Sequence, residues 1–366
     1  MVKRIDVGLL FSRSGTYALI SESCRIGALK AIERVNASPD ARIEIVPVER
    51  DPGGNVDRYA PLAADILRDT GARHIIGCTT SWSRKEVIPV LEKHGGILWY
   101  PAPYEGFEAS ENVVYMHACP NQHILPLLAY VVPRFGSRGF LVGSNYIWGW
   151  ETNRIARDLI RDAGGTVLGE RYLALGDEDV ARIVEDIRVH RPNFVLNNFV
   201  GATSYAFLQA YAELGRQDPW FQPKTCPLIS CNISEAELPA IGGNGEGHLS
   251  VGPYFDGLPR WQGEHLDSSL MASAYSAVMI LAEMLSGGDR ADDEMTFAGR
   301  QFRTPLGRIA IDPATRHAHL PVRIARIHAG RFEVVEEASA CLPPDPYLSR
   351  YDPKAAFARP GLRVVS

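Results

Sequence analysis

Residues 77–85 of this chain read Gly77-Cys78-Thr79-Thr80-Ser81-Trp82-Ser83-Arg84-Lys85. The stretch joins an apolar run at 74–76 to a helical pattern at 86–94, which predicts a strand, a hydroxyl-rich turn and a helix start. Ser81 or Ser83 can cap the helix, whose first N–H groups then point into the turn. Such a turn is either a plain helix cap or a binding site for the oxygen of a small polar ligand, because hydroxyls and the positive helix end meet there.

Strand and helix patterns alternate on both sides of this turn. In the first part of the chain the expected strands are 5–11, 43–48, 74–77, 97–100 and 113–116, and the expected helices are 22–35, 57–68 and 86–94. The same rhythm then returns, with strands at 139–142, 166–172, 193–197 and 228–230, and helices at 121–135, 150–163, 177–190 and 204–214. This alternation predicts an α/β fold of two similar units, each a mainly parallel sheet flanked by helices.

The last third of the chain changes character. Its expected helices are 268–285 and 293–302, and its expected strands are 307–311, 321–327 and 331–335, the last two joined as a hairpin through His328-Ala329-Gly330. A proline-rich tail, Leu342-Pro343-Pro344-Asp345-Pro346-Tyr347, is expected to pack as an irregular strap.

Aromatic residues gather where ligands bind in such folds. Ligands of open parallel sheets lie beyond the carboxyl ends of the strands. Tyr100, Tyr104, Tyr146 and Trp148 all follow expected strand ends. Each could equally be a core residue, but four rings at sheet-end turns favour a site for a flat ligand that is stacked and shielded from water.

Composition excludes several classes of function. The chain has 366 residues and a net charge of −5, which does not favour direct binding of nucleic acid. Its six cysteines are scattered without a Cys-x-x-Cys pair, as in proteins of a reducing cytoplasm. No apolar stretch is judged long enough to span a membrane. We therefore expect a cytoplasmic location, with a periplasmic one as the alternative if a signal peptide has been removed.

Motifs for catalysis or metal binding do not stand out. There is no Gly-x-Ser-x-Gly elbow, no Walker loop and no Gly-x-Gly-x-x-Gly, so we expect no enzyme, no catalytic residue and no cofactor. His317 and His319 could hold a metal, but a strand-edge pair is the better interpretation, and no metal site is predicted. Arg84 and Lys85 lie in a helix first turn against the dipole preference, either for the ligand site or for structure.

Several short motifs resemble one known family. The most specific are Leu98-Trp99-Tyr100-Pro101 and Pro103-Tyr104-Glu105-Gly106-Phe107-Glu108; others are Gly8-Leu9-Leu10-Phe11-Ser12, Asp51-Pro52-Gly53-Gly54, Asp57-Arg58-Tyr59, Ser83-Arg84-Lys85, Pro120-Asn121-Gln122, Tyr146-Ile147, Ser234-Glu235-Ala236-Glu237, Pro253-Tyr254-Phe255 and Pro344-Asp345-Pro346-Tyr347. The chain resembles the type I periplasmic-binding-protein fold. Within it, the chain looks like the amide-sensing negative regulator of the aliphatic amidase operon and the related urea and short-chain amide receptors.

The resemblance implies two lobes that close on a small neutral amide or urea. Lobe 1 would comprise residues 1–118 plus 254–330, and lobe 2 residues 119–253 plus 331–366. Matching positions imply ligand contacts at Ser81, Tyr100 and Tyr146. Three further contact positions hold residues that differ from those of the amide regulator, namely Thr79, Ala102 and Trp148. Thr80 looks more like the residue of the urea receptors.

Two functions follow from the resemblance. The first is an amide sensor that regulates amidase-type gene expression through a protein partner, an RNA-binding antiterminator. The alternative is the substrate-binding receptor of an amide or urea ABC importer. An amidase is a third reading, which lacks a nucleophile set. The oligomeric state stays open, a homo-oligomer included.

Overall fold

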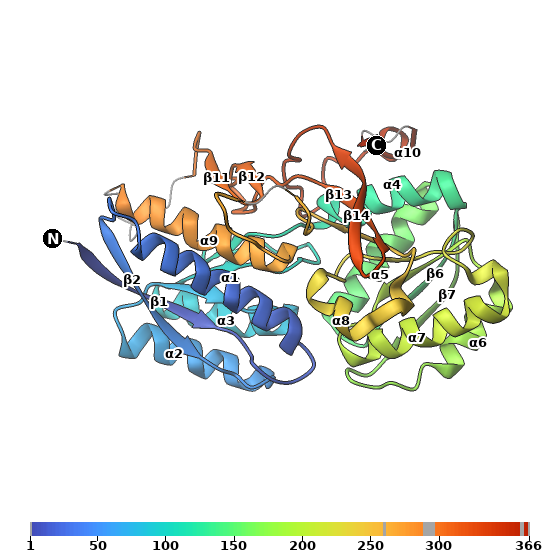
Figure 1. Cartoon of the computed structure of the whole chain (residues 1–366), viewed down its shortest axis with the longest axis horizontal. Coiled ribbons are helices and arrows are strands. Elements are labelled where there is room, and N and C mark those ends of the chain that lie inside the picture. Colours follow the sequence, from blue (N-terminus) through green and yellow to red (C-terminus); the bar gives the residue numbers. More distant parts are fainter. Residues whose placement is uncertain (1, 259–260, 288–296, 359–361, 365–366) are drawn as a thin grey trace. The chain divides into compact units, whose positions relative to one another are not determined.

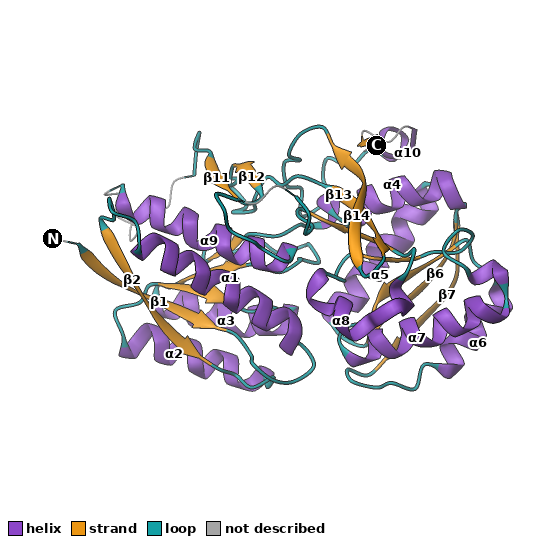
Figure 2. Ribbon diagram, in the orientation of Figure 1, coloured by secondary structure: helices purple, strands orange, loops and turns teal. Residues whose placement is uncertain are grey.

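The computed structural model describes residues 2–258, 261–287, 297–358 and 362–364. Two compact units divide these residues: unit 1 comprises Met1–Tyr104, Glu108–Ala118 and Pro259–Leu320, and unit 2 comprises Glu105–Phe107, Cys119–Leu258 and Pro321–Ser366. Each is an α/β unit (Figures 1 and 2), as the alternating patterns predict.

Unit 1 is built on a five-stranded parallel sheet in the order β2-β1-β3-β4-β5. Its strands are β1 (Lys3–Leu10), β2 (Ile43–Arg50), β3 (His74–Gly77), β4 (Ile97–Tyr100) and β5 (Val113–Tyr115), with a small hairpin of β11 (Phe302–Thr304) and β12 (Gly307–Ile309). Its helices are α1 (Ala18–Asn36), α2 (Tyr59–Asp69), α3 (Ser81–His94) and α9 (Ser269–Ser286). Helix α1 packs along α9, and α2 packs against α3 (Figure 1).

Unit 2 is built on an eight-stranded sheet in the order β15-β14-β13-β10-β9-β8-β6-β7. Its strands are β6 (Arg138–Ser144), β7 (Thr166–Leu173), β8 (Phe194–Asn198), β9 (Leu228–Ser230), β10 (Leu249–Gly252), β13 (Arg323–His328), β14 (Arg331–Ala338) and β15 (Leu362–Val364). Its helices are α4 (Ile124–Phe135), α5 (Ile147–Asp162), α6 (Ala181–His190), α7 (Ala202–Gln217), α8 (Leu238–Ile241) and α10 (Pro353–Ala358). Strands β6 to β10 are parallel, and β13 to β15 are antiparallel.

The boundary between the units differs from the expected lobes at three places. Strand β13, expected in lobe 1, pairs with β10 in the sheet of unit 2, because its backbone groups complete the ladder of that strand. Residues 254–258, also expected in lobe 1, belong to unit 2, as do Glu105–Phe107. The chain thus passes from unit 2 back to unit 1 at the peptide bond between Phe107 and Glu108.

Helix α9 corrects the expectation that no apolar stretch is long enough to span a membrane. By length and composition its 18 residues could cross one, and it is the one such helix among the residues described. However, 78% of it is buried in the protein, as in the core helix of a soluble domain. Small residues allow this: Gly27 of α1 lies so close to the carbonyl oxygen of Met271 that a Cβ atom would overlap it.

Of the other elements expected in the last third of the chain, some agree with the structure and one does not. The hairpin through Ala329 and Gly330 forms, and its strands β13 and β14 pair up to His328 and Arg331. The strap is held by Asn121 and Gln122, whose side-chain amides donate to the carbonyls of Pro343 and Leu342. Of the helix expected at 293–302, residues 293–296 lie outside the described residues, and Phe302 begins strand β11.

Five of the six cysteines are buried, and no disulfide joins any of the six, all of which lie in the described part of the chain. Burial raises the pKa of Cys78, Cys119 and Cys226 to about 12. These thiols are therefore protonated and unreactive at neutral pH.

Candidate functional site

The turn after β3 starts in a backbone conformation that is unusual for its residue type. Cys78 has a φ of 62°, in the left-handed region that a side chain disfavours. Its N–H group donates to the carbonyl oxygen of Leu10 on β1 at 3.1 Å, which fixes the exit from the strand. Gly77 has no room for a side chain, because a Cβ atom would lie 2.6 Å from the same carbonyl. Such locally held strain is often found at binding sites.

The cap of α3 differs from the expected one. The N-cap residue is Thr80, and neither Ser81 nor Ser83 takes that position. The Thr80 hydroxyl accepts the backbone N–H of Ser83 at 3.2 Å, and the Ser83 hydroxyl accepts the backbone N–H of Thr80 at 3.2 Å, which together form a capping box. Thr80, predicted as a ligand contact, thus has its hydroxyl engaged within the turn.

Two other hydroxyl residues of the turn, Thr79 and Ser81, lie at the helix start. Thr79 is 6% exposed, and its Oγ1 has no hydrogen-bond partner among the described residues. Ser81 is 2% exposed and is the first residue of the 14-residue helix α3. A buried hydroxyl without a partner lowers the stability of the folded protein by about 1–3 kcal/mol. The Thr79 hydroxyl therefore does not stabilise the fold. The positive end of α3 adds attraction for a ligand oxygen.

The next turn along the same sheet edge carries the predicted residues after β4. Because β4 lies beside β3, the carboxyl ends of both strands bring the two turns to one edge. Tyr100 is 1% exposed and ends β4, and Ala102 is buried beside it. Tyr104 is also buried, and its hydroxyl donates to the backbone carbonyl of Glu108, so its polar end serves the loop that follows.

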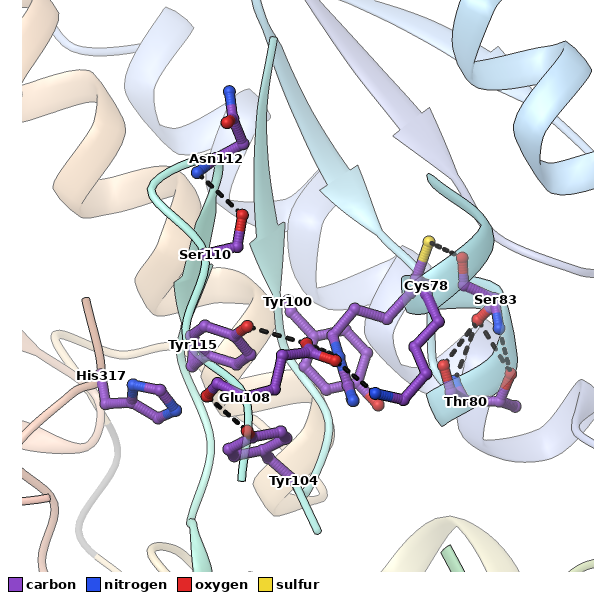
Figure 3. A network of polar contacts seen from close by, with 12 residues as sticks. Cys78, Thr80, Ser83, Tyr100, Tyr104, Glu108, Ser110, Asn112, Tyr115 and His317 are labelled. Carbon is purple, nitrogen blue, oxygen red and sulfur yellow. Dashed lines mark hydrogen bonds and ion pairs between the residues drawn. The ribbon is translucent and has the colours of Figure 1, made fainter. Parts of the chain in front are cut away.

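Arg84 and Lys85, whose role the sequence leaves open, both contact Glu108, which lies in a polar network with Tyr104 and Tyr115 (Figure 3). The Arg84 side chain is fully buried, and its Nε–H group donates to Oε1 of Glu108 at 2.8 Å. Lys85 donates to Oε2 of the same carboxylate. Burial on its own would raise the pKa of Glu108, but Arg84 and Lys85 beside it lower that pKa to about 2. Glu108 is therefore ionised at neutral pH.

His317 packs against this network through Tyr115. Its ring stacks on Tyr115 with the centroids 4.0 Å apart and the planes at 5°. Burial lowers its pKa to about 4, so the ring is neutral, and its Nδ1 lies 2.6 Å from the carbonyl oxygen of Thr315. Over the described ranges, no three His, Cys, Asp or Glu side chains group as metal ligands.

Unit 2 carries the other two predicted residues. Tyr146 is the N-cap residue of α5 and is 3% exposed. Trp148 follows in the first turn of α5, 4% exposed, with its ring 5.7 Å from that of His123. The indole Nε1 of Trp148 has no hydrogen-bond partner within the described chain. A buried N–H donor of this kind is available to an acceptor on a ligand.

Sequence reasoning missed further polar residues of unit 2. Asn198 ends β8, is fully buried and donates through Nδ2 to Oδ1 of Asn153 at 2.8 Å, while its own Oδ1 has no partner among the described residues. Thr203, in the first turn of α7, is also buried with its hydroxyl unpartnered over the same residues. The signal for Asn198 was available: two amide residues, Asn197 and Asn198, follow the apolar residues 194–196.

The structure thus groups six predicted residues in unit 1 and two in unit 2. Those in unit 1 are Thr79, Thr80, Ser81, Tyr100, Ala102 and Tyr104, and those in unit 2 are Tyr146 and Trp148. Each set lies at turns that follow parallel strands of its own sheet, where ligands of such sheets bind.

Comparisons with known proteins match nearly the whole chain. Residues 5–353 fit the family model described as periplasmic binding protein domain. A Rhodopseudomonas palustris solute binding protein of an ABC transporter, solved with 4-hydroxybenzoate, is 20% identical with a TM-score of 0.80, over 95% of this chain and 100% of that one. A second from the same organism, solved with benzoate, is 16% identical with a TM-score of 0.80, over 94% and 98% of the chains.

A structure from Streptococcus pneumoniae is similar as well. It is a substrate binding protein of a branched-chain amino acid transporter, solved with isoleucine. It is 14% identical with a TM-score of 0.74, over 91% of this chain and 99% of that one. At such identities the likeness establishes the two-lobed α/β fold, and the ligand has to be argued from the site.

Proposed function

The chain belongs to the periplasmic binding protein domain family, and on this basis we propose that it is the substrate-binding receptor of an ABC importer for a small organic solute. The similar solved structures, which are an ABC transporter solute binding protein and an amino acid transporter substrate binding protein, support the proposal. Family membership also fits a binding protein better than an enzyme. Purified protein should accordingly release no ammonia from acetamide.

The ligand that we propose is an uncharged short-chain amide or urea. The observation that carries this choice is the buried hydroxyl of Thr79 just before α3, which has no hydrogen-bond partner among the described residues, together with a first helix turn that holds no acidic residue. A carbonyl oxygen is the group that such donors bind. The resemblance of residues 98–108 to amide and urea receptors supports the same choice.

Each predicted residue has a role in this proposal. Thr79 and Ser81 bind the carbonyl oxygen, and the rings of Tyr100, Tyr146 and Trp148 flank the planar ligand. Thr80 holds the cap, and Tyr104 supports the loop that carries Glu108. Ala102 supplies a methyl group where the amide regulator has a hydroxyl, so the ligand is held by fewer hydrogen bonds there.

The expected affinity is modest because the ligand is small. A ceiling of about −1.5 kcal/mol per heavy atom gives roughly −6 kcal/mol for four atoms, or a dissociation constant of tens of micromolar. Losing one hydrogen bond of about 1–3 kcal/mol then weakens binding by roughly tenfold or more.

A thermal-shift and calorimetric screen tests the proposal. Acetamide, propionamide, butyramide, formamide and urea would be compared on the wild type, on Ser81→Ala and on Tyr146→Ala. Ser38→Ala removes a hydroxyl from an exposed loop and serves as the control. We expect at least one compound to bind the wild type and the control, and to lose affinity in both site variants. Equal binding by all four proteins would show that the ligand lies elsewhere.

A cytoplasmic amide sensor is the second candidate, favoured by the same 98–108 run. In this reading ligand binding shifts the affinity for an RNA-binding antiterminator by as much as the ligand prefers one lobe arrangement. Fractionation of cells that express the tagged native gene separates the candidates. A periplasmic protein supports the receptor, whereas a cytoplasmic one that retains an RNA-binding protein supports the sensor.

A further inference from the structure

Arg84 is a buried cation at the start of α3, beside the turn proposed to bind the ligand. It lies in the first turn of α3, three residues after Ser81, and its side chain is fully buried. The positive end of the helix does not favour a cation there. A buried guanidinium is costly to desolvate, so its retention calls for a reason beyond helix stability.

Protein groups on several sides neutralise and enclose this cation. The rings of Tyr100 and Tyr104 cover it, each with its centroid 4.8 Å from the guanidinium carbon. Glu108 accepts its Nε–H group at 2.8 Å. The hydroxyl of Tyr115 donates to the same carboxylate oxygen at 2.9 Å, which holds Glu108 in place (Figure 3).

Tyr100 connects this enclosure to the proposed ligand. It is one of the proposed ligand contacts, and the same ring lies over Arg84. The charge of Arg84 is therefore one ring away from the ligand in unit 1, at a distance where an uncompensated cation would act strongly in a site of low dielectric. Glu108 compensates it from within the protein, and its other carboxylate oxygen accepts a hydrogen bond from Lys85.

From these contacts we propose that Glu108 is a specificity-determining residue: its carboxylate occupies Arg84, so that the site selects uncharged amides over carboxylates of the same shape. This inference rests on the proposed function, because it concerns the ligand of the same site. Glu108 acts through Arg84 and Tyr100, and it need not touch the ligand.

Isosteric ligand pairs test the proposal by calorimetry near pH 7.5. The pairs are acetamide and acetate, butyramide and butyrate, and benzamide and benzoate. We expect the wild type to bind the amide of any bound pair at least about tenfold more tightly. In Glu108→Gln this preference should fall by about tenfold or more, because the cation of Arg84 then lacks its carboxylate.

Two further variants bracket this result. Glu111→Gln removes a neighbouring exposed carboxylate and should keep the wild-type preference. The double variant Arg84→Gln, Glu108→Gln removes both charges and should also keep it, even if Glu108→Gln alone does not fold. A wild type that binds a carboxylate as tightly as its amide would overturn the proposal, as would an unchanged preference in Glu108→Gln.

A second measurement does not depend on the ligand class. Sodium formate, a small carboxylate, should raise the melting temperature of Glu108→Gln more than that of the wild type or Glu111→Gln at equal ionic strength. If no amide binds but formate acts selectively, the proposed function is wrong and the masking of Arg84 stands. Equal effects of formate on all three proteins would refute the masking.

Discussion

The hydroxyl of Tyr205 donates a hydrogen bond to Oε1 of Glu237 at 3.2 Å, and Oε2 accepts the backbone N–H of Ser234 at 3.1 Å. Glu237 is 3% exposed, and burial raises its pKa from 4.5 to about 7, although both hydrogen bonds oppose this shift. The carboxyl is therefore half ionised at neutral pH without an ion-pair partner in these contacts.

This raised pKa makes unit 2 less stable in alkali. The folded protein holds the proton of Glu237 more tightly than the unfolded chain, so the stabilisation is complete below pH 4.5 and is lost as the pH rises through about 7. The loss amounts to roughly 3 kcal/mol. In urea unfolding between pH 5 and 8, Glu237→Gln should show a shallower decline than the wild type. Parallel declines would contradict the assignment.

His248 gives the opposite dependence at low pH. Its Nδ1 accepts the N–H of Leu228 at 3.0 Å, and burial lowers its pKa from 6.5 to about 3. Because the unfolded chain binds the proton first, stability is full above pH 6.5 and falls as the pH drops toward 3. Asn can supply the same acceptor without titrating, so His248→Asn should lose less stability between pH 7 and 4.5. Circular dichroism melts at both pH values would measure the difference.

Thr79 and Thr80 are adjacent hydroxyls with opposite roles. Thr80→Val removes the capping box and should cost about 1 kcal/mol of unfolding free energy. Thr79→Val replaces a buried hydroxyl that lacks a partner among the described residues, so it should leave stability equal or up to about 1 kcal/mol higher. Only Thr79→Val should weaken ligand binding directly. Chemical denaturation together with calorimetry on the two variants would show the contrast, and equal destabilisation by both would contradict it.

Gly27 is required by the packing of α1 on α9. A Cβ atom there would overlap the carbonyl oxygen of Met271, a backbone atom that cannot move without its helix. Gly27→Ala should therefore cost about 3 kcal/mol despite the better helix propensity of alanine. Gly243→Ala is the matched control, because no described residue other than its chain neighbours lies within 4 Å of its Cβ position. Differential scanning calorimetry should show a lower melting temperature for Gly27→Ala alone.

The sequence was most informative where a pattern is local. Apolar runs and helical spacing locate β3, β4 and α5 to within a few residues, whereas the ligand contact at Tyr146 stays a prediction of the strand-end rule. The start of α3 was placed five residues late, since Trp82 and Arg84 do not match an amphipathic helix pattern when their burial is unknown.

Long-range compensation could not be predicted. A charged residue in a helix first turn normally faces solvent, and nothing local shows that Arg84 is enclosed by Tyr104 and paired with Glu108, which is 24 residues away in sequence. The pairing of β13 with β10 could likewise not be predicted. The sequence pattern of the β13–β14 hairpin does not show which other strand β13 will pair with, because that depends on the sheet that the hairpin joins.

The burial of α9 has a consequence for what happens to this protein when unit 1 unfolds. Once unit 1 opens, an apolar segment as long as a bilayer is thick loses the partners that keep it out of lipid. Variants such as Gly27→Ala are therefore expected to end up in the membrane pellet or in inclusion bodies instead of refolding. The loss of such a variant from cell extracts would reflect exposure of helix α9 to lipid or to other chains, and not a lower affinity for the proposed ligand.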